Sequence, residues 1–307
     1  MTIGDGELRY KLVRDWGRLP DGLTFDKVSG MAVDSRDRVY LFARTKDPVI
    51  VLEADGSFVT TWGQGVFTRA HGIYIDRHDR VFCADDKDHT VREFTTGGTL
   101  VRTWGTPGRG SDTGYDGKNP ETVLRGGAPF NRPTGVCFDS AGEMFVTDGY
   151  GNARVHRFDT EGQLAVSWGE PGDGPGEFHS PHCLRVAKNG QVYVVDKENS
   201  RIQVFTRDGQ HIANWSGVNR PNDILIDEMD RIHVIESPGQ ITVFSLGGEV
   251  LARWGKNDPQ AEPGEDLQRA HTIAMDSTGA IYVAGCAHDY VSKYEPVSQQ
   301  AGLQRAA

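Results

Sequence analysis

The chain has 307 residues, 38 of them glycine, and a formal net charge of -10 at pH 7. The acidic balance argues against a nucleic-acid surface, and no run of about 18 apolar residues offers a membrane span. The glycine content exceeds the usual ~7% without a collagen period, so we expect a single large domain, or two ordinary ones, with many turns.

The N-terminal segment and the cysteines predict the compartment. Residues 1–7 lack the basic and apolar regions of a signal peptide. Four widely spaced cysteines each lie in an apolar run, and they are Cys83, Cys137, Cys183 and Cys286. We expect core thiols rather than disulfides, and hence a soluble cytoplasmic protein.

One pattern recurs six times along the chain and is marked by tryptophan. Five tryptophans precede glycine and one precedes serine, at Trp16, Trp62, Trp104, Trp168, Trp254 and Trp215. Taken in chain order, they lie 46, 42, 64, 47 and 39 residues apart. Intervals of this size are typical of propeller blades.

A hairpin follows each of these tryptophans after a loop. Its first strand alternates and ends in Asp, except once in Ala187, and the six strands are residues 29–34, 71–76, 134–139, 182–187, 222–227 and 271–276. A tight turn leads to a β-branched and aromatic second strand, such as residues 39–42, and a third and a fourth strand complete each unit. Six such units predict an all-β fold, a six-bladed β-propeller.

The two ends of the chain suggest how the propeller closes. The sixth repeat has a hairpin and a third strand near residues 290–294, but no tryptophan strand follows it. We expect residues 10–16 to supply that strand, which leaves no exposed edge. The predicted propeller covers residues 8–297, and residues 298–307 read as a disordered tail. A solenoid, the alternative, would need polar capping repeats that the chain lacks.

Aligning the repeats reveals a candidate metal site. The position five residues before the terminal Asp, or before Ala187, holds Ser29, His71, Thr134, His182, Asn222 and His271. Equivalent positions of innermost strands share one height on the axis, and alternate blades of six are about 120° apart. Three imidazoles with an open fourth position are the ligand set of a catalytic Zn²⁺, and other divalent transition metals are alternatives. The structural alternative is that each His fills the channel and bonds a neighbour.

The second strands end on the same face as these histidines. The tenth position after the terminal Asp, or after Ala187, holds Arg44, Asp86, Lys197 and Ser237 in four of the repeats. Tyr150 is at the eleventh position of its repeat. Arg44 and Lys197 suit an anionic small-molecule substrate, with Asp86 as a further contact. A nearby cation would lower the pKa of Tyr150 and allow it to act as a base.

Other features have weaker functional signals. The long loop of residues 105–131 fits either a lid or substrate wall or a solvated insertion. Carboxylates that end second strands are expected to have structural roles, and these are Asp85, Asp148, Asp196 and Glu236. Three histidines are expected at the surface, namely His78, His211 and His233. Auxiliary roles stay open for His89, His156, His179 and His288.

The repeats resemble NHL repeats. Three stretches are more specific, namely residues 148–154, 180–182 and 195–205. They resemble the catalytic domain of peptidyl-α-hydroxyglycine α-amidating lyases, and the similarity covers nearly the whole propeller.

The resemblance implies roles for individual residues. The family's three zinc-binding histidines match His71, His182 and His271, its proposed base matches Tyr150, and an arginine matches Arg44. The implied reaction cleaves the N–C bond of a carbinolamide to give an amide and glyoxylate. Zinc would polarise the hydroxyl oxygen, and Tyr150 would take its proton.

The chain also departs from that family. Lys197 replaces a second arginine, keeping the charge but losing the bidentate fork. Thr272 replaces an aspartate ligand of calcium, which argues against a structural Ca²⁺. Gly151 stands in place of a cysteine, the secretory disulfides have no counterpart, and no hydroxylating domain accompanies the propeller. These differences favour a small metabolite over a secreted peptide as the substrate.

Three functions therefore remain open. The first is a zinc-dependent lyase acting on a small α-hydroxylated amide, amine or related carboxylate. The second is a metal-dependent hydrolase or hydratase, such as a lactonase, with zinc-bound water as nucleophile and Tyr150 or Asp86 assisting. The third is a non-catalytic NHL propeller that binds a protein partner. A lyase consumes no water, a hydrolase incorporates solvent oxygen, and the binding module holds no stoichiometric metal.

Overall fold

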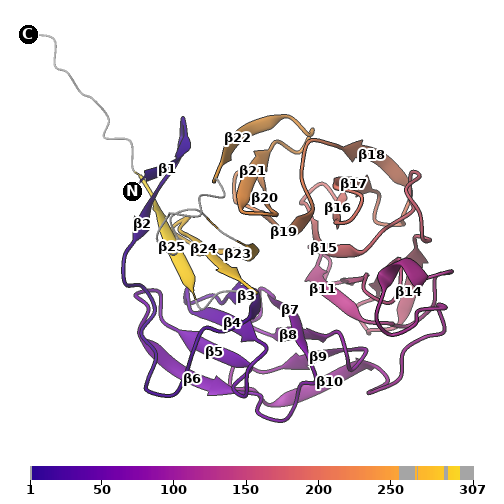
Figure 1. The fold of residues 1–307 in the computed structure, drawn as a ribbon, viewed down its shortest axis with the longest axis horizontal. Coiled ribbons are helices and arrows are strands. Elements are labelled where there is room, and N and C mark those ends of the chain that lie inside the picture. Colours follow the sequence, from indigo (N-terminus) through magenta and orange to yellow (C-terminus); the bar gives the residue numbers. More distant parts are fainter. Residues whose placement is uncertain (1, 256–266, 268, 287–289, 298–307) are drawn as a thin grey trace, which may run out of the picture.

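The computed structural model describes residues 2–255, 267, 269–286 and 290–297, which form six antiparallel sheets around a central axis (Figure 1). The first three blades are β3 (Val28–Val33), β4 (Val39–Ala43), β5 (Val49–Leu52) and β6 (Phe58–Trp62); β7 (Ala70–Ile75), β8 (Val81–Asp85), β9 (Thr90–Phe94) and β10 (Leu100–Gly105); and β11 (Pro133–Phe138), β12 (Met144–Asp148), β13 (Arg154–Phe158) and β14 (Leu164–Trp168). The next two are β15 (Pro181–Val186), β16 (Val192–Asp196), β17 (Arg201–Phe205) and β18 (His211–Trp215); and β19 (Pro221–Ile226), β20 (Ile232–Glu236), β21 (Gln240–Phe244) and β22 (Val250–Trp254). The sixth holds β23 (Ala270–Met275), β24 (Ile281–Gly285), β25 (Val291–Pro296), β2 (Leu8–Val13) and β1 (Thr2–Asp5). The predicted six-bladed β-propeller is confirmed.

An aspartate holds the turn between the first two strands of most blades. In blade one, Asp34 Oδ1 accepts the backbone N–H groups of Arg36 and Arg38, each at 2.9 Å. The same pair of bonds recurs at Asp76, Asp139, Asp227 and Asp276. An Asp side chain that bonds the backbone two and four residues ahead stabilises a tight turn, which explains why the repeats end in this residue.

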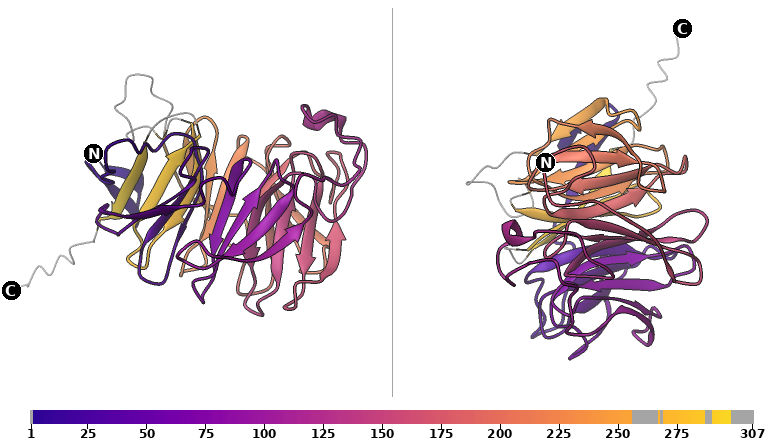
Figure 2. Two further views of the ribbon diagram at one scale, coloured as in Figure 1. Left: turned by 90° about the horizontal axis from the view of Figure 1, so that it is seen from below. Right: turned by 90° about the vertical axis from the view of Figure 1, so that its right-hand side faces the viewer.

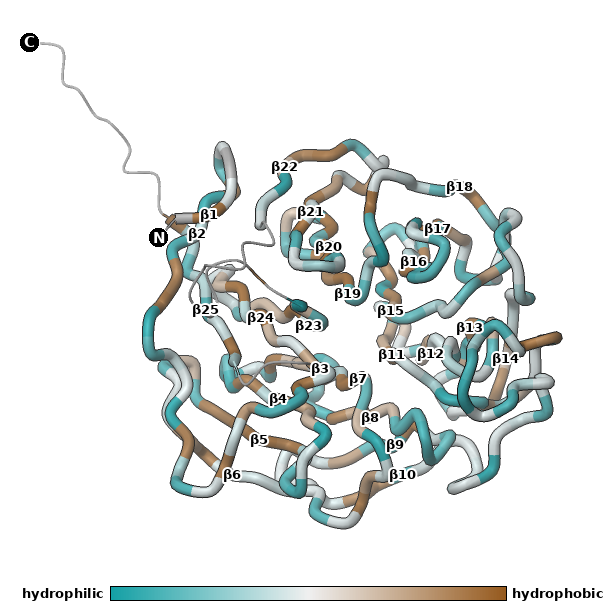
Figure 3. Tube along the Cα trace, in the orientation of Figure 1, coloured by the Kyte–Doolittle hydropathy of each residue, from teal (hydrophilic) through white to brown (hydrophobic). Residues whose placement is uncertain are grey.

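The hydrophobic core lies between neighbouring blades. All five residues of each second strand, such as β4 or β16, are buried. The tryptophans pack across the blade interfaces: the ring of Trp62 lies 5.1 Å from that of Phe94 in the next blade, and Trp16 Nε1 donates to Ala54 O of blade one at 3.0 Å. Apolar residues accordingly follow the strands, and hydrophilic residues gather in the connecting loops (Figure 3).

The N-terminal strand closes the ring, as the repeat pattern predicts. β2 pairs antiparallel with β25, with Tyr10 opposite Pro296 and Leu12 opposite Tyr294 (Figure 1). The Tyr10 ring also lies 5.7 Å from Trp254 of blade five, so β2 joins two blades. β1, which the sequence analysis did not anticipate, pairs with the outer side of β2.

Seen from the side, the blades form a disc, and one short element projects beyond it (Figure 2). This is the 3-10 turn η1 (Pro120–Thr122), which belongs to the long loop before β11. No helix within the described ranges is long and apolar enough to cross a bilayer. The predicted tail, residues 298–307, lies outside the described residues, as does His288.

Candidate active site

Three histidines from alternate blades meet on the propeller axis. His71, His182 and His271 are the second residues of the innermost strands β7, β15 and β23. One ligand atom from each lies within 4.8 Å of the others, and their rings are 4.8–5.5 Å apart between centroids. The structure therefore brings together the three residues that the repeat alignment placed at one height.

The blades between them orient the imidazole rings. Each Nδ1 lies within hydrogen-bond distance of a backbone oxygen at the same repeat position of the following blade: His71 with Thr134 at 2.7 Å, His182 with Asn222 at 2.6 Å, and His271 with Ser29 at 3.0 Å. A carbonyl oxygen accepts only, so each Nδ1 carries the proton and each Nε2 keeps its lone pair. That tautomer is the one in which Nε2 can bind a metal.

A glycine makes one of these contacts possible. A Cβ atom on Gly72 would lie 2.5 Å from Thr134 O, the oxygen that accepts from His71 Nδ1. Only a residue without a side chain lets β7 and β11 approach this closely.

The environment keeps the three rings neutral. Burial lowers the pKa of all three well below the usual value of 6.5. The positive charges of Arg44 on His71, and of Lys197 on His182 and His271, lower these pKa values further. Neutral imidazole is the form that coordinates a metal ion.

Tyr150 completes the ring from the loop after β12. Its hydroxyl oxygen lies 2.9 Å from Nε2 of His71 and 2.9 Å from Nε2 of His182. A phenol has one proton, so it donates to only one of these two acceptors. Three Nε2 lone pairs thus point to the axis, and only the Tyr150 hydroxyl proton lies among them. A divalent cation bound by the three nitrogen atoms would provide the positive charge that these lone pairs lack. The donor set therefore fits a metal ion.

The hydroxyl of Tyr150 is strongly influenced by its surroundings. Burial raises its pKa well above the usual value, and the charge of Asp86 adds to this effect. Arg44 and Arg69 oppose the rise because they favour a negatively charged oxygen. Positive charge next to this group is thus what ionisation requires.

The predicted rim residues differ in their surroundings. Arg44, which follows β4, donates from Nε to the backbone oxygen of Ala70 at 3.0 Å, directly beside His71. Lys197, which follows β16, is half-buried, and burial lowers the pKa of its ammonium group. Asp86 is fully buried and forms ion pairs with Arg69 at 2.9 Å and Arg132 at 3.4 Å.

Sequence reasoning missed Arg69 and Arg132. Both guanidinium groups lie over the Tyr150 ring, at 5.8 Å and 5.3 Å from its centroid. Their signal was present in the repeat alignment, two positions before the histidine register, where the six blades carry Lys27, Arg69, Arg132, Ser180, Arg220 and Arg269. The position is basic in five blades of six, which a comparison of side-chain charge at this position would have shown.

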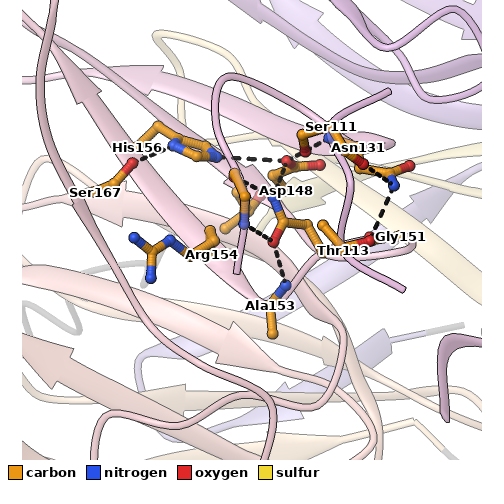
Figure 4. Close-up of polar contacts among 12 residues, drawn as sticks. Ser111, Thr113, Asn131, Asp148, Gly151, Ala153, Arg154, His156 and Ser167 are labelled. Carbon is orange, nitrogen blue, oxygen red and sulfur yellow. Dashed lines mark hydrogen bonds and ion pairs between the residues drawn. The ribbon is translucent and has the colours of Figure 1, made fainter. Parts of the chain in front are cut away.

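The long loop before β11 packs against the Tyr150 segment. Thr113 is buried, and its hydroxyl donates to the backbone oxygen of Gly151. Asn131 Nδ2 donates to Ser111 O at 2.9 Å and to Thr113 Oγ1 at 3.0 Å (Figure 4). Tyr115 accepts a hydrogen bond from Arg132, the residue that covers Tyr150. These contacts favour the wall interpretation of this loop over a solvated insertion.

The carboxylates at the ends of second strands are structural, as predicted. Each is buried and accepts a backbone N–H from the residue three positions before the histidine register; the pairs are Asp85 with Thr68, Asp148 with Asn131, Asp196 with His179, and Glu236 with Asn219. Asp148 Oδ2 also accepts from Asn152 at 2.8 Å and faces His156 Nε2 at 3.4 Å (Figure 4). His156 is therefore part of the buried hydrogen-bond network around Asp148, which is structural.

Two predictions about single residues were wrong. His233, expected at the surface, is fully buried on β20 with its Nε2 3.0 Å from Asp227 Oδ2. Cys286, expected in the core, is only half-buried at the rim position that corresponds to Arg44. The other three cysteines are buried, and all four are free thiols.

Comparison with known proteins matches NHL repeats at residues 130–158 and 178–205, in blades three and four. The chain is 26% identical over 322 residues to NHL repeat-containing protein 3 of Homo sapiens, covering 95% of this chain and 86% of that protein. It is 29% identical over 196 residues to a probable peptidyl-alpha-hydroxyglycine alpha-amidating lyase of Caenorhabditis elegans, covering 58% of this chain and about half, 55%, of that one.

Solved structures agree on the architecture. A virginiamycin B lyase from Staphylococcus aureus superposes with a TM-score of 0.60 at 15% identity, covering 94% of this chain and 89% of that one. At this identity the match shows the fold alone. The chain is thus a propeller containing NHL repeats, with sequence similarity to α-amidating lyases.

Proposed function

We propose that this propeller is a zinc-dependent lyase that cleaves the C–N bond of a small α-hydroxylated, carboxylate-bearing substrate. The observation that carries the proposal is the Tyr150 hydroxyl, placed 2.9 Å from two nitrogen atoms of a neutral three-histidine ring. The similarity to an α-amidating lyase supports the same chemistry. His71, His182 and His271 would hold the ion, and three neutral nitrogen ligands with room for a fourth suit Zn²⁺.

The side chains around the opening of the three-histidine ring have separate roles in the proposed reaction. An ion held by His71, His182 and His271 would supply Lewis-acid charge, which would polarise the substrate hydroxyl and favour ionised Tyr150. Arg44, held beside His71 by its bond to Ala70 O, orients the substrate carboxylate. Tyr150 Oη takes the hydroxyl proton, and the carbonyl forms as the C–N bond breaks. The C–N electron pair goes to nitrogen, which takes up a proton, so the products are an amide and a 2-oxo acid, and no water is consumed.

The first test combines metal content with product identity. Protein purified without added metal or an affinity tag should hold about one zinc per chain, and His182→Ala should lose it. His211→Ala, on the outer strand β18, is the matched control and should keep it. With an N-acyl α-hydroxyglycine as substrate, the expected products are the amide and glyoxylate.

Other outcomes select the alternatives. In H₂¹⁸O, an acyl product that appears as a labelled carboxylic acid with release of ammonia would indicate a hydrolase. No bound transition metal, and no uptake on titration, would remove the enzyme proposal and leave the protein-binding propeller.

A further inference from the structure

The mouth of the histidine ring carries more positive than negative charge. Arg44, Arg69, Arg132 and Lys197 are all half-buried around it. Among the described residues, Asp86 is the only carboxylate that forms an ion pair with any of these four side chains. These four cations and the one carboxylate paired with them therefore carry an excess of three positive charges, in a chain whose net charge is -10.

Two of these cations share a single counter-charge. Asp86 has no exposed surface and bonds Arg69 through one oxygen and Arg132 through the other. Two guanidinium groups against one carboxylate leave one positive charge uncompensated, directly over the Tyr150 ring. Arg132 has only 12% of its side chain exposed, so water compensates little of that charge.

The other two cations flank the ring from different blades. Arg44 of blade one is anchored to Ala70 O, and the backbone N–H of Lys197 in blade four donates to Ser180 O, two residues before His182. Blades one and four face each other across the axis of a six-bladed propeller. Neither side chain pairs with a carboxylate in the part of the chain that the structure describes. Partly desolvated cations without a carboxylate partner are stabilised when an anion binds next to them.

We infer that this mouth recognises a substrate with two anionic groups rather than one. The proposed lyase reaction accounts for one carboxylate, next to the carbon that carries the hydroxyl. An excess of three positive charges leaves room for a second anionic group, a carboxylate or a phosphate, on the part of the substrate attached to nitrogen. This inference rests on the proposed function, because both use the same mouth.

Binding of a matched pair of small acids tests it without turnover. Succinate and its monoamide, succinamate, have nearly the same shape and differ by one negative charge. Titration calorimetry on the full chain should show succinate binding about tenfold more tightly, with the difference shrinking as salt is added. 3-Phosphonopropionate, in which a phosphonate replaces one carboxylate of succinate, is titrated in the same way, and it should bind more tightly than succinate if the second anionic group is a phosphate and more weakly if it is a carboxylate.

Two variants locate the effect. Arg69→Gln should lower succinate affinity about tenfold and succinamate affinity much less, because the lost charge serves the second anion. Arg36→Gln is the matched control, an exposed arginine in the turn between β3 and β4 at the far end of the strands, and it should change neither. Equal affinities for the two acids, or equal losses in both variants, would overturn the inference. If the enzyme forms glyoxylate but does not prefer dianions, this inference fails and the proposed lyase function stands. If it prefers dianions but forms no glyoxylate, the lyase function fails and the inference about two anionic groups stands.

Discussion

The hydroxyl of Tyr150 lies 2.9 Å from Nε2 of His182, although 32 residues separate them. The contact exists because the loop after β12 is fixed at both ends. Asp148 bonds the backbone N–H of Asn131 at 2.7 Å and Nδ2 of Asn152 at 2.8 Å, while Gly151 O accepts from Thr113 (Figure 4). The position of the proposed base therefore depends on buried polar groups outside the histidine ring.

Tyr150→Phe should separate metal binding from chemistry. The ring can still pack against Arg69 and Arg132, and the three histidines are unchanged, so the zinc content should stay the same. Turnover should fall about 10²- to 10⁴-fold, because the group that takes the proton is gone. Tyr193→Phe, on β16 of blade four, removes a hydroxyl that donates to Leu246 O of blade five, and it should leave turnover unchanged. Full activity of Tyr150→Phe would exclude this residue as the base.

Asp148→Ala should destabilise the fold and impair the site together. It leaves the Asn131 N–H and the Asn152 amide without their buried acceptor, so the free energy of unfolding should drop by about 3 kcal/mol in urea titrations. Among the residues that the structure describes, the exposed turn residue Asp55 bonds only Ser57, so Asp55→Ala should lower the free energy of unfolding much less. A similar decrease in the free energy of unfolding for both variants would show that the hydrogen bonds of Asp148 contribute no more to stability than those of an exposed turn.

Acid should weaken the fold through Asp227. Burial by itself raises the pKa of this carboxyl, but hydrogen bonds from His233 and from the backbone and side chain of Arg231 outweigh burial and lower the pKa to about 2. The folded protein thus binds this proton less readily than the unfolded chain, so the stabilisation is present above about pH 4 and is lost as the pH falls through about 2.

The variant Asp227→Asn checks this assignment. After allowance for solvent screening, it should lower the free energy of unfolding by about 1–2 kcal/mol at pH 6. The difference from wild type should shrink as the pH falls through about 2 and vanish below it, where the wild-type carboxyl is protonated in both the folded and the unfolded state. Urea unfolding of the two proteins across this range provides the measurement, and a difference that is independent of pH would contradict the assignment.

Deleting the N-terminal strand should open the propeller. Removal of residues 1–14 exposes the edge of β25 and removes Tyr10 from its contact with Trp254. We expect loss of cooperative thermal unfolding and association through the bare edge, measured by light scattering. Removal of residues 1–6 alone deletes β1 but keeps β2, and this variant should be as monodisperse as the wild type.

The sequence determined the fold because its signals are local and repeated. Alternating strands, the Asp turns and the tryptophan spacing recur six times, so a weak signal at one repeat is reinforced by the others. Closure by the N-terminal strand was predictable for the same reason, since the sixth repeat lacked one strand, although β2 covers Leu8–Val13 rather than the predicted residues 10–16. Periodicity also gave the shared height of His71, His182 and His271, because equivalent positions of identical blades must lie on one ring.

What only the tertiary structure decided lies between blades. The alignment gave the height of Tyr150, but not its contact with two histidines, which depends on how the loop of residues 105–131 packs beneath it. The pairing of Asp86 with Arg69 and Arg132 joins two blades, and the burial of His233 depends on Asp227. Such contacts join residues with no fixed spacing along the chain, so no period in the sequence encodes them. Charged side chains pair with partners that are close in space rather than in sequence. The packing of neighbouring blades therefore decides which charged side chains remain unpaired and can bind a ligand.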